Sequence, residues 1–117
     1  MALALAAPAA AQAPNIVQVA TGQVHSYALG ASGQVWCWGK NSFGQLGDGT
    51  EENRQSPVRV RDLGGGAVQV ATGQSHSCAV RDNGRVFCWG SNLDGQLGNR
   101  TLAASSRPLP VRFPRAQ

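Results

Sequence analysis

The feature that most constrains the fold is an internal repeat. When residues 17–49 are placed over residues 68–100, twenty of the 33 positions are identical at a constant offset of 51 residues, without a gap. A period near 50 residues is typical of a β-propeller blade of about four short strands, and not of a helical solenoid unit. The sequence therefore predicts an all-β chain of two propeller blades, with repeat 1 at residues 14–63, repeat 2 at residues 64–113 and a tail at 114–117.

Local patterns within each repeat predict antiparallel hairpins. Apolar and polar residues alternate over 16–20, and the segments 25–29 and 34–38 flank the turn Ala31-Ser32-Gly33. In repeat 2, the segments 76–80 and 85–89 flank Asp82-Asn83-Gly84, where glycine supplies the positive φ of a three-residue loop. A shorter echo at an offset of 53 links residues 56–60 to 109–113, and it predicts that the second inter-repeat loop is two residues longer.

The repeated residues are mostly of the kind that shapes turns. The chain has 15 glycines, which is more than a helical bundle tolerates, and most of them fall in pairs 51 residues apart. A residue that recurs once per blade favours a structural role over a unique catalytic one. We assign that role to Gly22, His25, Gly39, Asn41, Gly44, Gln45 and Gly47 in repeat 1, and to Gly73, His76, Gly90, Asn92, Gly95, Gln96 and Gly98 in repeat 2.

Three segments of each repeat together resemble a known family. The order Val-Ala-x-Gly-x-x-His-Ser, Gly-x-Val-x-x-Trp-Gly and Asn-x-x-Gly-Gln-Leu-Gly is similar to the repeat of the regulator of chromosome condensation family, and it occurs twice between Val17 and Phe113. The resemblance implies a seven-bladed propeller that serves protein binding, guanine-nucleotide exchange, chromatin attachment or inhibition of secreted β-lactamases. Two blades form an incomplete ring, so we expect either assembly with other chains or, preferably, a fragment of a longer protein.

The three cysteines predict one disulfide. Cys78 and Cys88 lie five residues on either side of Asn83, and directly opposed strand residues have Cα atoms about 4.5 to 5.5 Å apart, which a disulfide accepts. The matching positions in repeat 1 are Tyr27 and Cys37, so we expect an unpaired Cys37 thiol, buried against a neighbouring blade. A metal site at His76, Cys78 and Cys88 is disfavoured, because the chain has neither a C-x-x-C nor an H-x-x-x-H spacing.

No motif specifies a reaction. The carboxylates lie mostly in loops, and the glycine-rich segments match neither a dinucleotide loop nor a phosphate loop. The sequence thus predicts a non-enzymatic chain without catalytic residues, cofactor or metal. The strand aromatics Trp36, Trp38, Phe87 and Trp89 are expected in the core, and Phe43 is the exposed exception because its counterpart is Asp94.

Charge and loop variation predict the class of partner. The net charge of +4 comes from scattered arginines, which does not favour a specific nucleic-acid site. We expect a protein-interaction scaffold that contacts another protein or further propeller blades; the alternatives are an exchange regulator of a small GTPase and an inhibitor of a secreted enzyme. The loops 48–56 and 99–108 differ between repeats and predict partner contacts at Glu51, Glu52, Arg54 and Arg100, and the exposed Phe43 is a further predicted contact.

The first thirteen residues resemble a secretory leader. Met1 to Ala13 holds eight alanines and no charge, and its apolar run is shorter than the roughly 20 residues that span a bilayer. Cleavage before Gln12 is favoured, although the basic start of a signal peptide is missing, and an alanine-rich tail is the alternative. The segment predicts an extracytoplasmic protein, periplasmic or secreted, with no membrane span.

Overall fold

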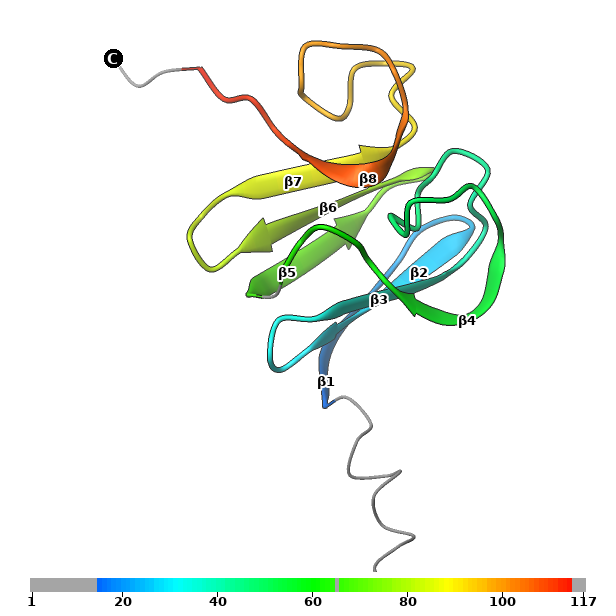
Figure 1. Cartoon of the computed structure of the whole chain (residues 1–117), viewed down its shortest axis with the longest axis vertical. Coiled ribbons are helices and arrows are strands. Elements are labelled where there is room, and N and C mark those ends of the chain that lie inside the picture. Colours follow the sequence, from blue (N-terminus) through cyan, green and yellow to red (C-terminus); the bar gives the residue numbers. More distant parts are fainter. Residues whose placement is uncertain (1–14, 65, 115–117) are drawn as a thin grey trace, which may run out of the picture.

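The fold consists of eight short strands (Figure 1). The computed structural model describes residues 15–64 and 66–114, so the leader expected at residues 1–13 lies outside the described part. Within that part, no helix is long and apolar enough to cross a bilayer. The strands are β1 (Ile16–Thr21), β2 (His25–Gly30), β3 (Val35–Gly39), β4 (Arg54–Arg59), β5 (Ala67–Thr72), β6 (His76–Arg81), β7 (Val86–Gly90) and β8 (Ser105–Pro110).

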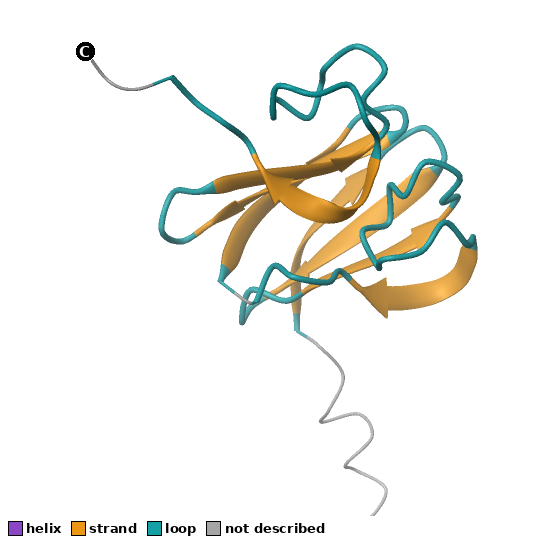
Figure 2. Cartoon of the chain, turned by 45° about the horizontal axis from the view of Figure 1, so that its top comes forward, coloured by secondary structure: helices purple, strands orange, loops and turns teal. Residues whose placement is uncertain are grey.

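The strands form two antiparallel sheets, one for each repeat. Blade 1 has the order β1-β2-β3-β4 and blade 2 has the order β5-β6-β7-β8, with each strand paired to its neighbour in sequence. Figures 1 and 2 show the two sheets stacked one against the other, with the loops after β3 and β7 gathered at one end. This arrangement confirms the prediction of two four-stranded propeller blades.

The turns within the blades are those that the sequence predicts. The β2–β3 and β6–β7 hairpins close at Gly33 and Gly84, whose φ angles are +88° and +84°. This left-handed conformation is costly for residues with a Cβ atom, and glycine adopts it freely.

The prediction that the second inter-repeat loop is two residues longer than the first is wrong. Trp36 pairs with Arg59 and Phe87 pairs with Pro110, so the offset of 51 residues continues through the outer strands β4 and β8. Pro57 therefore corresponds to Pro108, whereas the sequence echo had matched it to Pro110. The ladder to β3 and β7 sets the register of these edge strands, where prolines are tolerated and carry little positional information.

The core lies between the two blades. One face of blade 1 presents Tyr27, Leu29, Val35 and Cys37, and these residues are almost fully buried. Blade 2 covers them with the opposite face of its own sheet, and the cluster continues through Val70, Ala79 and Trp89. Each blade therefore buries one face in this contact and leaves an outer face, which on blade 1 carries Trp36 and Trp38, both half-buried.

Candidate functional site

The contact between the blades is organised around one tryptophan. Trp89 at the end of β7 is fully buried and reaches from blade 2 into blade 1. Its indole Nε1–H donates to the Gln45 carbonyl at 3.0 Å and lies 2.6 Å from the Tyr27 hydroxyl oxygen. A buried indole N–H requires such partners, so these bonds fix the position of the ring between the blades.

The Gln45 carbonyl collects three donors at this point. The Tyr27 hydroxyl and the Ser77 hydroxyl both donate to it, in addition to Trp89. Burial raises the pKa of Tyr27 well above its ordinary value, so the hydroxyl keeps its proton and remains a donor. The Asn-x-x-Gly-Gln-Leu-Gly loop of blade 1 thus provides the acceptor that receives blade 2.

A histidine makes a second polar bond across the contact. His25 Nε2 lies 2.9 Å from the Ser77 hydroxyl, which itself donates to Gln45, so the imidazole supplies the hydrogen at Nε2. Burial lowers the pKa of His25 below its ordinary value of 6.5, because the charged ring is poorly solvated there. His25 therefore acts as a neutral hydrogen-bond donor between the blades.

A third bond joins the inner strands. The backbone N–H of Val70 in β5 donates to the Gln18 side-chain oxygen in β1 at 2.9 Å. Gly22 shows how closely these strands approach, because a Cβ atom there would lie 2.5 Å from the Gly73 carbonyl oxygen. We call the set of interacting residues the blade joint: Gln18, His25, Tyr27 and Gln45 of blade 1, and Val70, Ser77 and Trp89 of blade 2.

One asparagine holds each loop that follows the third strand. The Asn41 side-chain oxygen accepts from the Leu46 N–H at 2.9 Å, and its amide donates to the carbonyls of Thr50 and Glu52. Asn92 repeats this pattern in blade 2, with the Leu97 N–H at 2.9 Å. These bonds give the repeated asparagine a structural role.

An ion pair closes the loop of blade 1. The Arg54 guanidinium donates to the Asp48 carboxylate at 2.9 Å. Burial alone would raise the pKa of Asp48, but the hydrogen bonds from Thr50 and Arg54 outweigh it and lower that pKa. Asp48 therefore stays ionised and anchors Arg54, which was predicted as a partner contact.

The cysteines take the arrangement expected from the hairpin register. Cys78 lies opposite Cys88 in the β6–β7 pair, and the two residues form a disulfide. Cys37 is a free, fully buried thiol that donates to the Leu46 carbonyl of its own blade. Burial raises the pKa of Cys37 to about 12, so it is an unreactive core residue.

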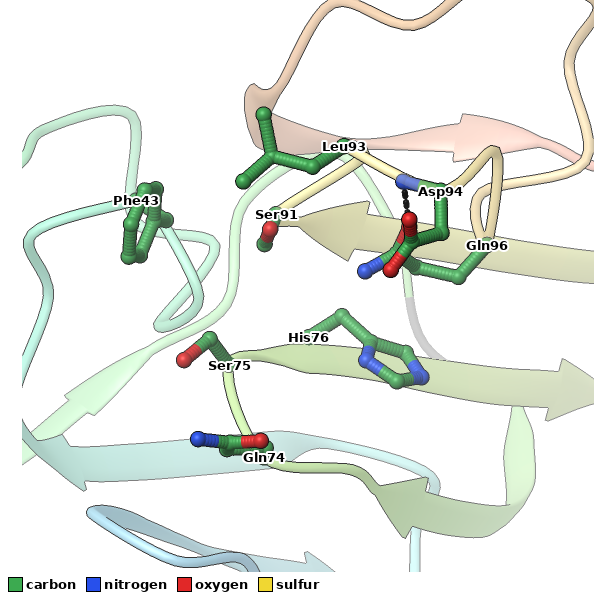
Figure 3. Close-up of a pocket in the computed structure, with 8 residues that line it drawn as sticks. All are labelled: Phe43, Gln74, Ser75, His76, Ser91, Leu93, Asp94 and Gln96. Carbon is green, nitrogen blue, oxygen red and sulfur yellow. Dashed lines mark hydrogen bonds between the residues drawn. The ribbon is translucent and has the colours of Figure 1, made fainter.

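A pocket lies beside the blade joint, at the end of the blades where the loops gather. It has a volume of about 360 Å³, and Figure 3 shows Phe43 on one side with Asp94 and Gln96 on the other. Leu93 stands along the rim and is 72% exposed, and Phe43 is 40% exposed. The remaining lining residues are polar: Gln74, Ser75, His76 and Ser91.

The predicted contact residues do not all meet at this pocket. Phe43 lines it, whereas Glu51, Glu52 and Arg100 are exposed on the loops and do not line it. In residues 15–64 and 66–114, no group of three or more His, Cys, Asp or Glu side chains could hold a metal ion. The pocket thus offers an apolar rim and hydrogen-bonding walls.

Sequence reasoning missed the bonds of the blade joint. Trp89 was expected in the core, but nothing in the local pattern showed that it would bond to Gln45, which lies 44 residues earlier. The available signal was the identical tryptophan before glycine in both repeats, Trp38-Gly39 and Trp89-Gly90. A polar aromatic at the same place in each blade is what a repeated blade contact requires.

The two four-stranded sheets, the 51-residue spacing between their equivalent residues and the blade joint together define a β-propeller repeat protein. The model of the regulator of chromosome condensation (RCC1) repeat matches residues 32–80 and 83–117, and a second model of the same repeat matches 16–45 and 67–96. The chain belongs to the RCC1 repeat family.

The relatives are much longer than this chain. It is 47% identical over 105 residues to the human probable E3 ubiquitin-protein ligase HERC3, and 48% identical over 102 residues to human HERC6. These matches cover 88% and 83% of this chain, and 10% of each ligase. The chain therefore spans about a tenth of the length of these relatives.

Solved structures share the fold. Human WBSCR16 is 36% identical, with a TM-score of 0.74 over 81% of this chain and 25% of that chain. Prp20p from Saccharomyces cerevisiae, studied for its binding to Gsp1p and histones, is 20% identical, with a TM-score of 0.78 over 87% of this chain and 26% of that one.

Proposed function

We propose that this chain is a non-enzymatic module of propeller blades that binds another protein at the Phe43 pocket. The observation that carries the proposal is the pair of exposed apolar side chains, Phe43 and Leu93, beside a pocket of about 360 Å³. Exposed apolar groups around a hollow are typical of protein contact sites, and the rigid blades hold them in place. Prp20p, a structural neighbour, binds Gsp1p and histones, which supports a protein as the class of partner.

The buried histidine and the buried carboxylate support a non-catalytic role. His25 is committed to Ser77 within the blade joint, and burial lowers its pKa. Asp48, the most buried carboxylate, is committed to Arg54 and Thr50. These groups hold the blades and loops together and are withdrawn from solvent.

Affinity capture tests the proposed site. The wild-type chain is immobilised beside Phe43→Ser and the control Phe113→Ser, which removes an aromatic that is 65% exposed and does not line the pocket. We expect the wild type and the control to retain the same protein from extracts of the source organism, and Phe43→Ser to lose it. Identical retained proteins for all three chains would contradict the proposal.

We also propose that the protein is exported. The leader pattern at Met1 to Ala13 supports this, as does the Cys78–Cys88 disulfide, because disulfides persist in oxidising compartments. Mass spectrometry of the N-terminus in the source organism is expected to find a chain that begins at Gln12 outside the cytoplasm. An intact Met1 in the cytoplasmic fraction would contradict export.

A further inference from the structure

Apart from Tyr27, whose counterpart in blade 2 is Cys78, each blade carries the residue types of both sides of the blade joint. Blade 1 uses Gln18, His25 and Gln45 to receive blade 2, and the positions 51 residues later in blade 2 hold Gln69, His76 and Gln96. Blade 2 uses Val70, Ser77 and Trp89 to enter the joint, and the corresponding residues of blade 1 are Val19, Ser26 and Trp38. The residue types are identical at all six positions.

The counterparts that take no part in the blade joint lie on the outer faces of the two blades. Val70 is 6% exposed in the joint, whereas its counterpart Val19 is 60% exposed. Trp89 and Ser77 are buried, whereas Trp38 and Ser26 are half-buried. On the other end of the chain, His76 and Gln96 are half-buried, although their counterparts His25 and Gln45 are buried.

The outer face of blade 1 is apolar and hollowed around Trp38. A pocket of about 340 Å³ is lined by Ile16, Ala28, Trp36, Trp38 and Pro57. In blade 2, the counterpart tryptophan is the residue that inserts between the blades. The Arg59 guanidinium lies over the Trp36 ring, 5.2 Å from its centroid, and the described part of the chain has no third sheet that packs on this face.

We propose that a second copy of this chain docks head to tail, with its blade 1 against the outer face of blade 2. Trp38 of the incoming copy would donate to the Gln96 carbonyl, and its Ser26 would meet His76, as Trp89 and Ser77 do within one chain. Blade 1 of the incoming copy would thus be placed relative to blade 2 as blade 2 is placed relative to blade 1 within one chain. Because the contact joins two different surfaces, each dimer keeps one free surface of each kind and adds further copies.

One residue makes the contact between copies weaker than the contact within the chain. Tyr27, whose hydroxyl meets Trp89, is replaced by Cys78 at the equivalent place in blade 2. The Cys78–Cys88 disulfide offers no hydroxyl there. Trp38 of the incoming copy therefore has the Gln96 carbonyl as its only acceptor. The contact between copies should dissociate on dilution, whereas the blade joint within each chain should remain formed.

Sedimentation velocity over a wide concentration series tests the proposal. The wild type is expected to form dimers and then larger species as concentration rises, and Trp38→Ala is expected to remain monomeric. Phe113→Ala is the matched control, because Phe113 is 65% exposed and lines neither pocket. Trp38 does not line the Phe43 pocket, so a loss of association in Trp38→Ala is distinct from a loss of the proposed protein-binding site.

A second variant is expected to change association in the opposite direction, and its urea unfolding transition shows whether it folds without the Cys78–Cys88 disulfide that it removes. Cys78→Tyr rebuilds the tyrosine and cysteine pair of blade 1, and it should tighten association about fivefold by adding one hydrogen bond. The proposal is overturned if the wild type is monomeric at every concentration, if association stops at two copies, or if Trp38→Ala associates like the wild type. Weaker association of a Cys78→Tyr chain that unfolds in urea like the wild type would also overturn it.

Discussion

At the scale of the residue, the blade joint concentrates polar bonds in a buried contact. Gln45 contributes its main-chain carbonyl, and side chains from both blades converge on it. Each of these donors would be costly to bury without a partner, so the bonds specify how the blades pack. The adjoining His25 extends the network and makes it sensitive to pH.

Stability should fall as pH drops through the range in which free histidine titrates. The pKa of His25 is lowered in the folded chain, so below 6.5 the unfolded chain binds more protons than the folded one. The free energy of unfolding should therefore decrease from about pH 7.5 to about pH 5.5, by at most about 1.4 kcal/mol per pH unit for one group. Urea unfolding at a series of pH values measures this decrease.

His25→Gln provides the comparison. The amide can still donate to Ser77 but does not titrate, so the decrease over this range should be smaller. Asp48 does not interfere, because its pKa lies below 3.8 and its contribution is lost only at lower pH. An equal slope for the wild type and His25→Gln would contradict the role given to His25.

Two glycines allow conformational strain to be separated from packing. Gly47 and Gly84 have φ angles of +69° and +84°, so alanine at either position is strained by about 1 to 2 kcal/mol. A Cβ atom at Gly47 would also lie 2.6 Å from Trp89 Nε1, whereas nothing lies within 4 Å at Gly84. Gly47→Ala should therefore destabilise the chain by about 1 to 3 kcal/mol more than Gly84→Ala.

Denaturant unfolding of these two variants measures that difference. Gly84→Ala is the control for the backbone conformation alone. Equal losses of stability in the two variants would show that Trp89 does not pack against the Gly47 turn.

At the scale of the element, the hairpins were predictable and the outer strands were not. The β2–β3 and β6–β7 hairpins depend on local signals, a glycine turn between alternating strands. β4 and β8 follow long loops, and their register is set by pairing with β3 and β7. The short sequence echo therefore matched Pro57 to Pro110, whereas the pairing matches it to Pro108.

The same distinction applies to the candidate site. Phe43 was predicted as exposed because it differs from Asp94 at the matching position. The Trp89, Tyr27 and Gln45 cluster was not predicted, because these residues meet only after two blades pack. Arg54 was predicted as a partner contact, and its ion pair with Asp48 was not foreseen.

The disulfide within the β6–β7 hairpin gives an element-scale prediction. Thiol titration of the denatured, unreduced chain should give one free group, that of Cys37. The native chain should react slowly, because Cys37 is buried and its pKa is raised to about 12. Three free groups after denaturation would contradict the disulfide, and one rapidly reacting group in the native chain would contradict the burial of Cys37.

At the scale of the whole molecule, two blades share one interface. The hydrophobic cluster spans both sheets, so the stability of each repeat depends on its neighbour, as in other repeat proteins. Trp89 of blade 2 and Tyr27 of blade 1, which lie 62 residues apart in sequence, interact directly across that interface.

A double-mutant cycle measures whether Trp89 and Tyr27 interact. The free energy of unfolding is measured in urea, at low chain concentration, for the wild type, Trp89→Phe, Tyr27→Phe and the double variant. Residues in contact typically show a coupling of about 0.5 to 3 kcal/mol, and we expect a value within this range. Losses that add to within about 0.3 kcal/mol would mean that the two side chains do not interact, and would contradict the packing of the two repeats as consecutive blades.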